Sequence, residues 1–197
     1  MCRFIESIQL SDGKLHRLEL HQARVNCVFA DHFPNKIPFN LNELFCQQDL
    51  PQKGLYKCRI VFDNQIHTVE ILPYSRREIR SLKLVDADID SHPYKPEDRS
   101  KLNEAYTKRG DCDDILIVKN GYLTDSWYAN IALWNGESWF TPAKPLIYGV
   151  QREALLEVGK IKEKDILATE LNEYQSICLF NAMIEFGELE LSVNAIR

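Results

Sequence analysis

Two Asn-Gly pairs constrain the fold of the second half of the chain more than any other feature. Asn120-Gly121 follows the continuous apolar run of residues 115–118, and Asn135-Gly136 precedes the shorter run of residues 138–140. An Asn-Gly pair between apolar runs predicts a two-residue hairpin turn, because both residues tolerate a positive φ. The segment between the two pairs, residues 122–134, is therefore predicted to be extended.

The rest of the chain mixes strands with helices. Turn residues and apolar alternation predict further strands at residues 4–10, 55–62, 65–72, 82–85, 177–180 and 189–193. Apolar periodicity and helix-start signals predict helices at residues 18–29, 40–45 and 96–109, and one that begins at Gly149. Most of the strands are joined by hairpins, which indicates an α+β fold. A basic, polar segment at residues 75–80 divides the chain into two predicted lobes, residues 1–80 and 81–197.

The helix at residues 96–109 is predicted from the residues at its two ends. Pro96 suits the first position of a helix, where its missing N–H costs nothing. Glu97 and Asp98 suit the positive end of the helix dipole. Gly110 is typical of the residue that follows a helix.

The composition argues against several classes of protein. The formal net charge is -5 and the lysines and arginines are scattered, so no nucleic-acid partner is expected. Residues 1–10 show no signal-peptide pattern and no stretch of about 18 apolar residues occurs, so we expect a cytoplasmic protein without a membrane span. The six cysteines lack C-x-x-C spacing and the five histidines lack metal-ligand spacing, which predicts reduced thiols and no metal site.

Three short motifs carry the chemical signal. The first is HQAR at residues 21–24, which places Arg24 on the first predicted helix. The second is GYLTDSWYAN at residues 121–130, which contains Asp125 and Asn130. The third is Thr141-Pro142 followed by GVQR at residues 149–152, where a helix begins. Each motif has an ordinary alternative: an exposed helix arginine, an aspartate that caps a hairpin, and a glycine that caps a helix.

In this order and at this spacing, the motifs resemble those of the class IV aminotransferase and 4-amino-4-deoxychorismate lyase family, the fold-type IV enzymes. The resemblance covers the chain from about residue 4 to residue 188. It implies a two-lobe α+β fold like that of D-amino-acid aminotransferase, with pyridoxal 5'-phosphate (PLP) as the cofactor. It also implies a homodimer, because the relatives are dimers.

The resemblance implies which residues bind the cofactor phosphate. Arg24 would bind it, since a guanidinium fork matches phosphate oxygens. Gly149 and the backbone N–H groups of Val150 and Gln151 would bind it at a helix N-terminus, which attracts anions. Gln151 stands where the family has a hydroxyl residue. Two more residues align with a segment near the phosphate, Asn181 and Ala182.

Asp125 stands where the family has a glutamate that pairs with the pyridine nitrogen of PLP. Asn130 follows at the family's spacing. A carboxylate at that place keeps the nitrogen protonated, which makes the ring an electron sink. The shorter side chain of aspartate is a departure from the family pattern.

The lysine that binds PLP covalently can be matched in two registers. Counting back from Gly110 selects Lys95, which lies between Tyr94 and Pro96 at a predicted strand-to-helix junction. Matching residues 102–103 to the family pattern instead puts Ser100 at the position, and Lys101 is then the alternative. Both lysines could lie on the surface, in which case the chain would be a non-catalytic relative.

The resemblance also implies a small-molecule substrate that carries a carboxylate and an amine. Arg59, on the predicted strand 55–62, is the candidate for the carboxylate, since it can bind in a bidentate manner; a solvated strand arginine is the alternative. Elimination on 4-amino-4-deoxychorismate, giving p-aminobenzoate and pyruvate, is the favoured reaction. Transfer of the amine of a branched-chain or D-amino acid is the alternative.

Overall fold

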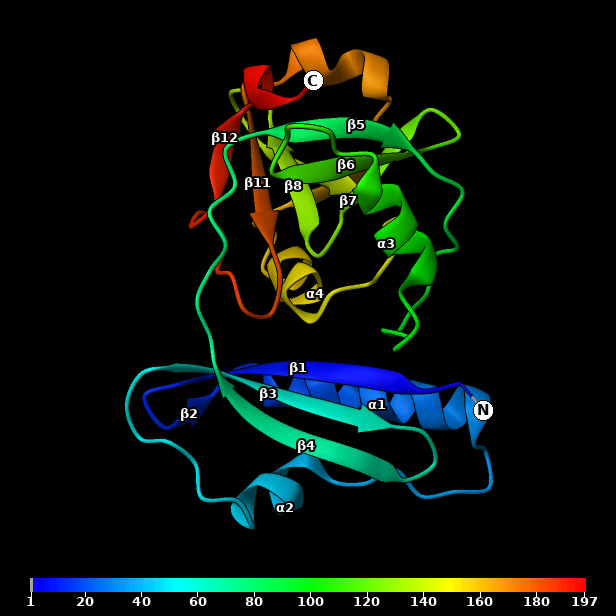
Figure 1. The fold of residues 1–197 in the computed structure, drawn as a ribbon, viewed down its shortest axis with the longest axis vertical. Helices are drawn as coiled ribbons and strands as arrows, with labels where there is room; N and C mark the ends of the chain where they lie inside the picture. Colours follow the sequence, from blue (N-terminus) through cyan, green and yellow to red (C-terminus); the bar gives the residue numbers. More distant parts are fainter. Residues whose placement is uncertain (1) are drawn as a thin grey trace. The chain divides into compact units, whose positions relative to one another are not determined.

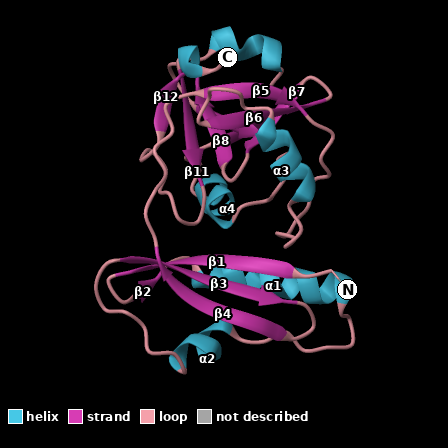
Figure 2. Ribbon diagram, viewed as in Figure 1, coloured by secondary structure: helices cyan, strands magenta, loops and turns pink. Residues whose placement is uncertain are grey.

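The structure is a computed structural model, which describes residues 2–197. These residues form a mixture of helices and strands (Figure 2), so the α+β prediction is confirmed. They divide into two compact units. The first unit contains the chain up to Arg76 together with residues 93–98, and the second contains residues 77–92 and 99–197. The predicted division at residue 80 does not include this return of residues 93–98 to the first unit.

The first unit is an antiparallel sheet with a helix along one face (Figure 1). Its strands lie in the order β2-β1-β3-β4, which are Lys14–Leu15, Phe4–Ser11, Leu55–Phe62 and Ile66–Pro73. Helix α1 (Leu18–His32) packs its apolar residues Val25, Val28 and Phe29 into one core with Ile8 and Leu10 of β1. The short helix α2 (Leu41–Cys46) begins after Asn40, whose Oδ1 accepts hydrogen bonds from two backbone N–H groups of its first turn.

Residues 93–98 pair with β1 rather than starting a helix. Ile5 N–H donates to the carbonyl of Lys95 at 2.9 Å, and Glu97 N–H donates to the carbonyl of Arg3 at 2.9 Å. Helix α3 therefore begins only at Ser100 and ends at Thr107 (Ser100–Thr107). The prediction of a helix over residues 96–109 was wrong at its start, because long-range pairing with β1 holds residues 95–97 in a bridged, non-helical conformation.

The second unit is built on a larger sheet. In the described part of the chain its strands lie in the order β10-β9-β8-β7-β6-β5, with β11 beside β8 and β12 beside β11. In chain order the strands are β5 (Leu82–Asp86), β6 (Asp114–Lys119), β7 (Tyr122–Ser126), β8 (Asn130–Trp134), β9 (Trp139–Pro142), β10 (Lys162–Lys164), β11 (Ser176–Phe180) and β12 (Glu190–Ser192). Helix α4 (Val150–Glu157) follows β9, and two short 3-10 helices, Ala168–Glu173 and Val193–Ala195, lie near the C-terminus.

The Asn120-Gly121 turn is as predicted, whereas the hairpin at Asn135-Gly136 has a four-residue loop, residues 135–138, because Trp134 pairs with Trp139 and only Gly136 of the pair has a positive φ. The segment between the two turns does not stay extended. Asn120 and Gly121 have φ values of 51° and 83°, and they join β6 to β7. The predicted strand over residues 122–134 is interrupted after Ser126, whose N–H donates to the carbonyl of Ala129 at 2.9 Å. The Ser126 hydroxyl accepts from the N–H of Ala129 at 3.1 Å. This local turn, which has no glycine to reveal it, folds β7 back against β8.

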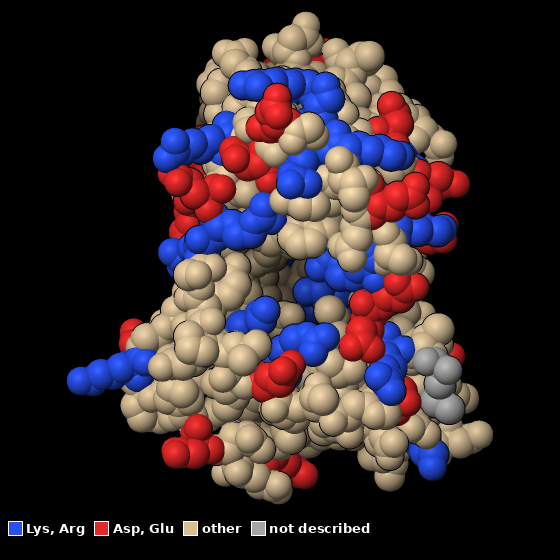
Figure 3. Space-filling view, viewed as in Figure 1, with Lys and Arg blue, Asp and Glu red and all other residues tan. Residues whose placement is uncertain are grey.

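The surface carries interspersed charges. On the face drawn in Figure 3, lysine and arginine side chains alternate with aspartate and glutamate in each unit. Within residues 2–197, none of the helices is long and apolar enough to cross a membrane.

All six cysteines are free thiols, and they divide into two groups by exposure. Cys2, Cys27 and Cys46 are exposed, whereas three others are buried, Cys58, Cys112 and Cys178. Burial raises the pKa of the Cys58 and Cys178 thiols to about 11. Since the thiolate is the reactive form, these two thiols are protected from reaction in two ways: they are buried, and they stay protonated at neutral pH.

We therefore expect three thiols to react quickly with a disulfide reagent at pH 8, and the other three only after unfolding. Counting the released chromophore in native buffer and in denaturant measures both groups. More than three fast thiols in the native protein would contradict the packing around Cys58 and Cys178.

Candidate functional site

The spacing of the second motif has a direct structural cause. Asp125 is on β7 and Asn130 is on β8, and the two residues lie opposite each other in the hairpin. Their side chains are hydrogen-bonded, with Asn130 Nδ2 donating to Asp125 Oδ1 at 2.8 Å. The four residues between them are those needed for the turn, so this spacing brings a carboxylate and an amide together.

Asp125 is a buried carboxyl held by three N–H groups. Besides Asn130, the backbone N–H groups of Leu146 and Ile147 donate to its Oδ2 at 2.6 and 3.0 Å. Burial raises its pKa to about 6, and the three donors counter this only in part. A buried carboxyl in this condition would be stabilised by a positively charged partner, which would lower its pKa again.

Gly149 is required by the close approach of Asn130. A Cβ atom at Gly149 would lie 2.1 Å from Asn130 Oδ1, although the backbone there (φ -75°) suits any residue. Asn130 cannot move aside cheaply, because its Nδ2 also donates to the carbonyl of Ile147 at 2.8 Å. The second and third motifs are thus parts of one packed cluster.

Replacing Gly149 by alanine should displace the Asn130 side chain and break its bond to Asp125. We expect a loss of roughly 1–3 kcal/mol in the free energy of unfolding, the usual cost of a broken buried hydrogen bond. Chemical denaturation of Gly149→Ala measures this loss. In an Asn130→Ala background the same substitution should cost much less, since the clash is gone; an undiminished cost there would contradict the argument.

The first turn of α4 lies beside the turn that follows β11. Gln151 is buried, and its Nε2 donates to Glu185 Oε2 at 3.4 Å. Asn181 accepts from the N–H groups of Met183 and Ile184, and its Nδ2 donates to the carbonyl of Tyr128 at 3.1 Å. The candidates Gly149, Val150, Gln151, Asn181 and Ala182 therefore belong to adjoining segments of the second unit. The first N–H groups of a helix have no intrahelical acceptor, so α4 offers donors there.

The remaining residues of the third motif have structural partners. Thr141 Oγ1 donates to the carbonyl of Ile131 at 2.7 Å. Arg152 is 1% exposed and donates to the carbonyl of Pro142 at 3.0 Å and to Glu163 at 2.6 Å. These bonds tie α4 to β9 and β10, which fixes the direction of the helix N-terminus.

In the first unit, Arg24 belongs to a buried charged cluster with Glu6 and His21. Its Nε and Nη2 donate to the two oxygens of Glu6 at 2.8 and 2.7 Å, and His21 Nδ1 lies 2.5 Å from Glu6 Oε2. Burial alone would raise the pKa of Glu6, but Arg24 and His21 outweigh it and lower that pKa to about 2. Burial lowers the pKa of His21; the contact with Glu6 counters this only in part, and the charges of Arg24 and Lys95 add to the lowering.

The two candidate lysines, Lys95 and Lys101, have different surroundings in the structure. The carbonyl of Lys95 accepts from the N–H of Ile5, the residue before Glu6, and the positive charge of Lys95 lowers the pKa of His21. Lys101 is on α3, its side chain is 61% exposed, and its Nζ pairs with Asp90 at 3.2 Å.

Arg59 is paired with two carboxylates, Glu70 at 3.0 Å and Glu97 at 3.5 Å. The candidate for the substrate carboxylate thus already has acidic partners within the first unit. Its role in binding a substrate stays a prediction.

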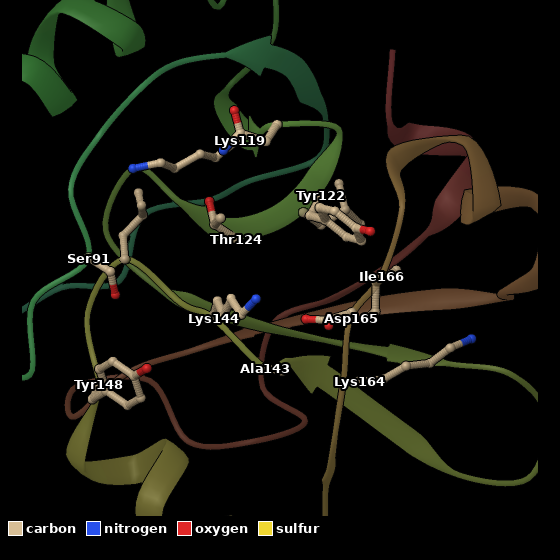
Figure 4. Close-up of a pocket in the computed structure, with 13 residues that line it drawn as sticks. Ser91, Lys119, Tyr122, Thr124, Ala143, Lys144, Tyr148, Lys164, Asp165 and Ile166 are labelled. Atoms are coloured by element: carbon tan, nitrogen blue, oxygen red, sulfur yellow. The ribbon is translucent and has the colours of Figure 1, made fainter.

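A cavity of about 390 Å³ lies elsewhere in the second unit (Figure 4). Thr124 lines it, and this residue precedes Asp125 on β7, so its side chain points to the opposite face of the strand. Leu146 also lines the cavity, and its N–H holds Asp125. None of the predicted site residues lines this cavity. Within residues 2–197, no group of three or more His, Cys, Asp or Glu side chains is placed to hold a metal.

Sequence reasoning missed Glu6 and the two backbone donors to Asp125. A signal for Glu6 existed: it interrupts the apolar alternation of Phe4, Ile8 and Leu10, which face α1. The N–H groups of Leu146 and Ile147 leave no signal in the sequence, because any residue other than proline supplies one.

Comparisons with known proteins point in one direction. A sequence profile of the family described as "Amino-transferase class IV" matches residues 92–188. A protein of Haemophilus influenzae, named "Uncharacterized protein", is 33% identical over 186 residues, which make up 93% of this chain and 98% of that protein.

Two solved structures extend the comparison. The crystal structure of a candidate 4-amino-4-deoxychorismate lyase from Haemophilus somnus 129pt has a TM-score of 0.86 and 30% identity, over 93% of this chain and 97% of that chain. The PLP-bound form of a hypothetical aminotransferase from Mycobacterium tuberculosis has a TM-score of 0.75 and 15% identity, over 98% of this chain and 81% of that chain. At 15% identity the second likeness concerns the fold alone.

Proposed function

Because the chain belongs to the amino-transferase class IV family, a family of PLP-dependent enzymes, we propose that it is a lyase that converts 4-amino-4-deoxychorismate into p-aminobenzoate and pyruvate. The fold-type IV prediction is confirmed by the structural likenesses. The choice of the lyase reaction is supported by the candidate lyase of Haemophilus somnus, which is similar over nearly the whole of both chains. A role in folate biosynthesis, a cytoplasmic location and a homodimer belong to the same proposal.

The observation that carries the proposal is the buried carboxyl of Asp125. Its raised pKa means that its hydrogen bonds and the positive charge of Arg152 do not fully compensate the burial of the charged form. The protonated pyridine nitrogen of PLP would supply the missing positive charge, so the residues present fit the cofactor at this point. Arg24 and the first N–H groups of α4 supply donors of the kind that bind phosphate.

In this proposal each residue has a distinct task. Lys95 would hold the cofactor covalently, Asp125 would keep its ring nitrogen protonated, and Arg24 with the N–H groups of Val150 and Gln151 would hold its phosphate. Asn130 and the N–H groups of Leu146 and Ile147 would keep the Asp125 carboxylate in place. When bound, PLP withdraws electrons from the carbon that bears the substrate amine.

The proposed reaction needs one group to take up and return protons. Lys95 Nζ would accept the proton that leaves the amine-bearing ring carbon. The C–O bond to the enolpyruvyl group then breaks, the ring becomes aromatic, and the released enolpyruvate takes up a proton to become pyruvate. Atoms and electrons balance without an oxidant or a reductant.

The second candidate, an aminotransferase, is supported by the family description. The two reactions differ in their need for a second substrate. A lyase forms p-aminobenzoate and pyruvate in equal amounts from one compound, whereas an aminotransferase needs a 2-oxo acid to accept the amine.

Two measurements test the proposal. The purified protein incubated with PLP should become yellow, and borohydride should fix the cofactor to the peptide that contains Lys95. Incubation with 4-amino-4-deoxychorismate should then release equal amounts of the two products without any 2-oxo acid. Failure to take up PLP would overturn the proposal, and amine transfer without pyruvate release would replace the lyase by the aminotransferase.

A further inference from the structure

We propose that Glu6 is a positioning residue, which orients Arg24 for the phosphate of PLP and is itself held by His21. The inference rests on the proposed function, because it concerns how one residue of the PLP site is aimed. It adds to that function two residues, Glu6 and His21, to which no role has been assigned.

The first observation is the place of the carboxylate. Glu6 is 1% exposed and lies on the face of β1 that packs against α1, between the core residues Phe4 and Ile8. An apolar residue there would continue the core, whereas a buried charge costs several kcal/mol unless its partners compensate. A buried charge at a core position of a strand, where an apolar residue is expected, occurs most often at a functional site.

The second observation is the geometry of the pair. Glu6 binds the Nε–Nη2 edge of Arg24 with both of its oxygens, and this bidentate contact fixes the plane of the guanidinium. Once that edge is held, the direction of the Nη1–Nη2 end is also set. An arginine aimed in this way loses less freedom when it binds an anion.

The third observation is how Glu6 is held. Its pKa of about 2 means that it is ionised at neutral pH, so the hydrogen bond to His21 is donated by Nδ1–H. In this tautomer Nε2 carries no proton, and among the described residues it has no hydrogen-bond partner. The imidazole of His21 therefore binds Glu6 through Nδ1 alone. His21 holds Glu6, and Glu6 in turn holds Arg24.

The test compares two ligands that differ only in the phosphate. The protein without cofactor is titrated with PLP and, separately, with pyridoxal, and binding is followed by the visible absorbance of the lysine-bound ligand. For Glu6→Gln we expect the Kd of PLP to rise on the order of 10–100-fold, comparable to the loss of a charge-assisted bidentate contact. The Kd of pyridoxal should change by less than about threefold, because pyridoxal has no phosphate for Arg24 to bind.

Matched variants separate positioning from general damage. Glu70→Gln removes an exposed acid that pairs with Arg59 in the same unit, and it should leave both Kd values unchanged. Arg24→Ala should weaken PLP selectively, and the double variant with Glu6→Gln should be no weaker than Arg24→Ala alone. If Glu6→Gln does not fold, Glu6→Asp keeps the charge, moves the oxygens away from Arg24 and should show the same selective loss.

Equal losses for PLP and pyridoxal, unchanged PLP binding, or an additive double variant would overturn the inference. These outcomes differ from a failure of the proposed function, in which the unaltered protein would bind neither ligand through a lysine.

Discussion

Replacing Lys95 by glutamine should lower the rate of product formation by at least about 10³–10⁴-fold, since it removes both the covalent link to the cofactor and the proton carrier. The same variant should lose the peptide that borohydride labels. Lys95 is preferred over Lys101 because its backbone pairs with Ile5, next to the cluster of Glu6, Arg24 and His21, whereas Lys101 is largely exposed. Turnover and labelling measured on one preparation test both functions of the side chain.

Lys101→Gln is the matched control for this experiment. It alters a largely exposed lysine on α3 that pairs with Asp90. Its activity should stay within about twofold of the unaltered protein, as for most surface substitutions. Label found on Lys101, with Lys95→Gln still active, would reverse the assignment.

Replacing Asp125 by asparagine should change catalytic activity and folding stability in different ways. Loss of the carboxylate should lower kcat on the order of 10²–10³-fold, the range observed when one preorganised electrostatic group is removed. The Kd of PLP should change much less, because the phosphate contacts remain. Asp111→Asn, at an exposed position of the same unit, is the control and should leave kcat unchanged.

The stability of this variant should depend on pH in a defined way. The pKa of Asp125 is about 6 in the folded state, above the ordinary aspartate value of 3.8, so the folded protein without cofactor holds the proton more tightly than the unfolded chain. Ionisation therefore destabilises the folded state as pH rises from about 4 to 6, by roughly 2–3 kcal/mol in total. Asparagine does not ionise, so its stability relative to aspartate should rise by that amount between pH 4 and pH 7.

Denaturation of both cofactor-free proteins at the two pH values measures this difference, and the other titrating groups cancel. A difference that does not change with pH would contradict the raised pKa. A variant with normal turnover and lower stability at both pH values would instead mean that Asp125 only caps the hairpin.

The sequence predicted the local features of the fold better than the non-local ones. The Asn120-Gly121 hairpin and the short helix predicted at residues 40–45 were found because each depends on a few adjacent residues. The start of α3 was predicted wrongly, because Pro96 and Glu97 pair with β1, which is about ninety residues away in the sequence. The turn at residues 127–129 was missed because the Ser126 hydroxyl stabilises it in place of a glycine.

The same distinction applies to the candidate site. The pairing of Asp125 with Asn130 follows from the length of a hairpin, so a motif can record it. The donors of the loop 146–147 and the contact of Glu6 with Arg24 join segments that are distant in sequence, and only the folded chain brings them together. No single residue pattern encodes such contacts.

The return of residues 93–98 to the first unit has a consequence for synthesis on the ribosome. The polypeptide passes from one unit to the other three times, after Arg76, His92 and Asp98. When residue 76 has been made, Lys95 and Glu97 have not yet been translated. The N–H of Ile5 and the carbonyl of Arg3, which bond to them in the folded unit, therefore lack these partners at that stage. The first unit can be completed only after part of the second has been translated, so a fragment that stops at residue 76 would lack both the segment that pairs with Phe4 and Ile5 and the proposed catalytic lysine.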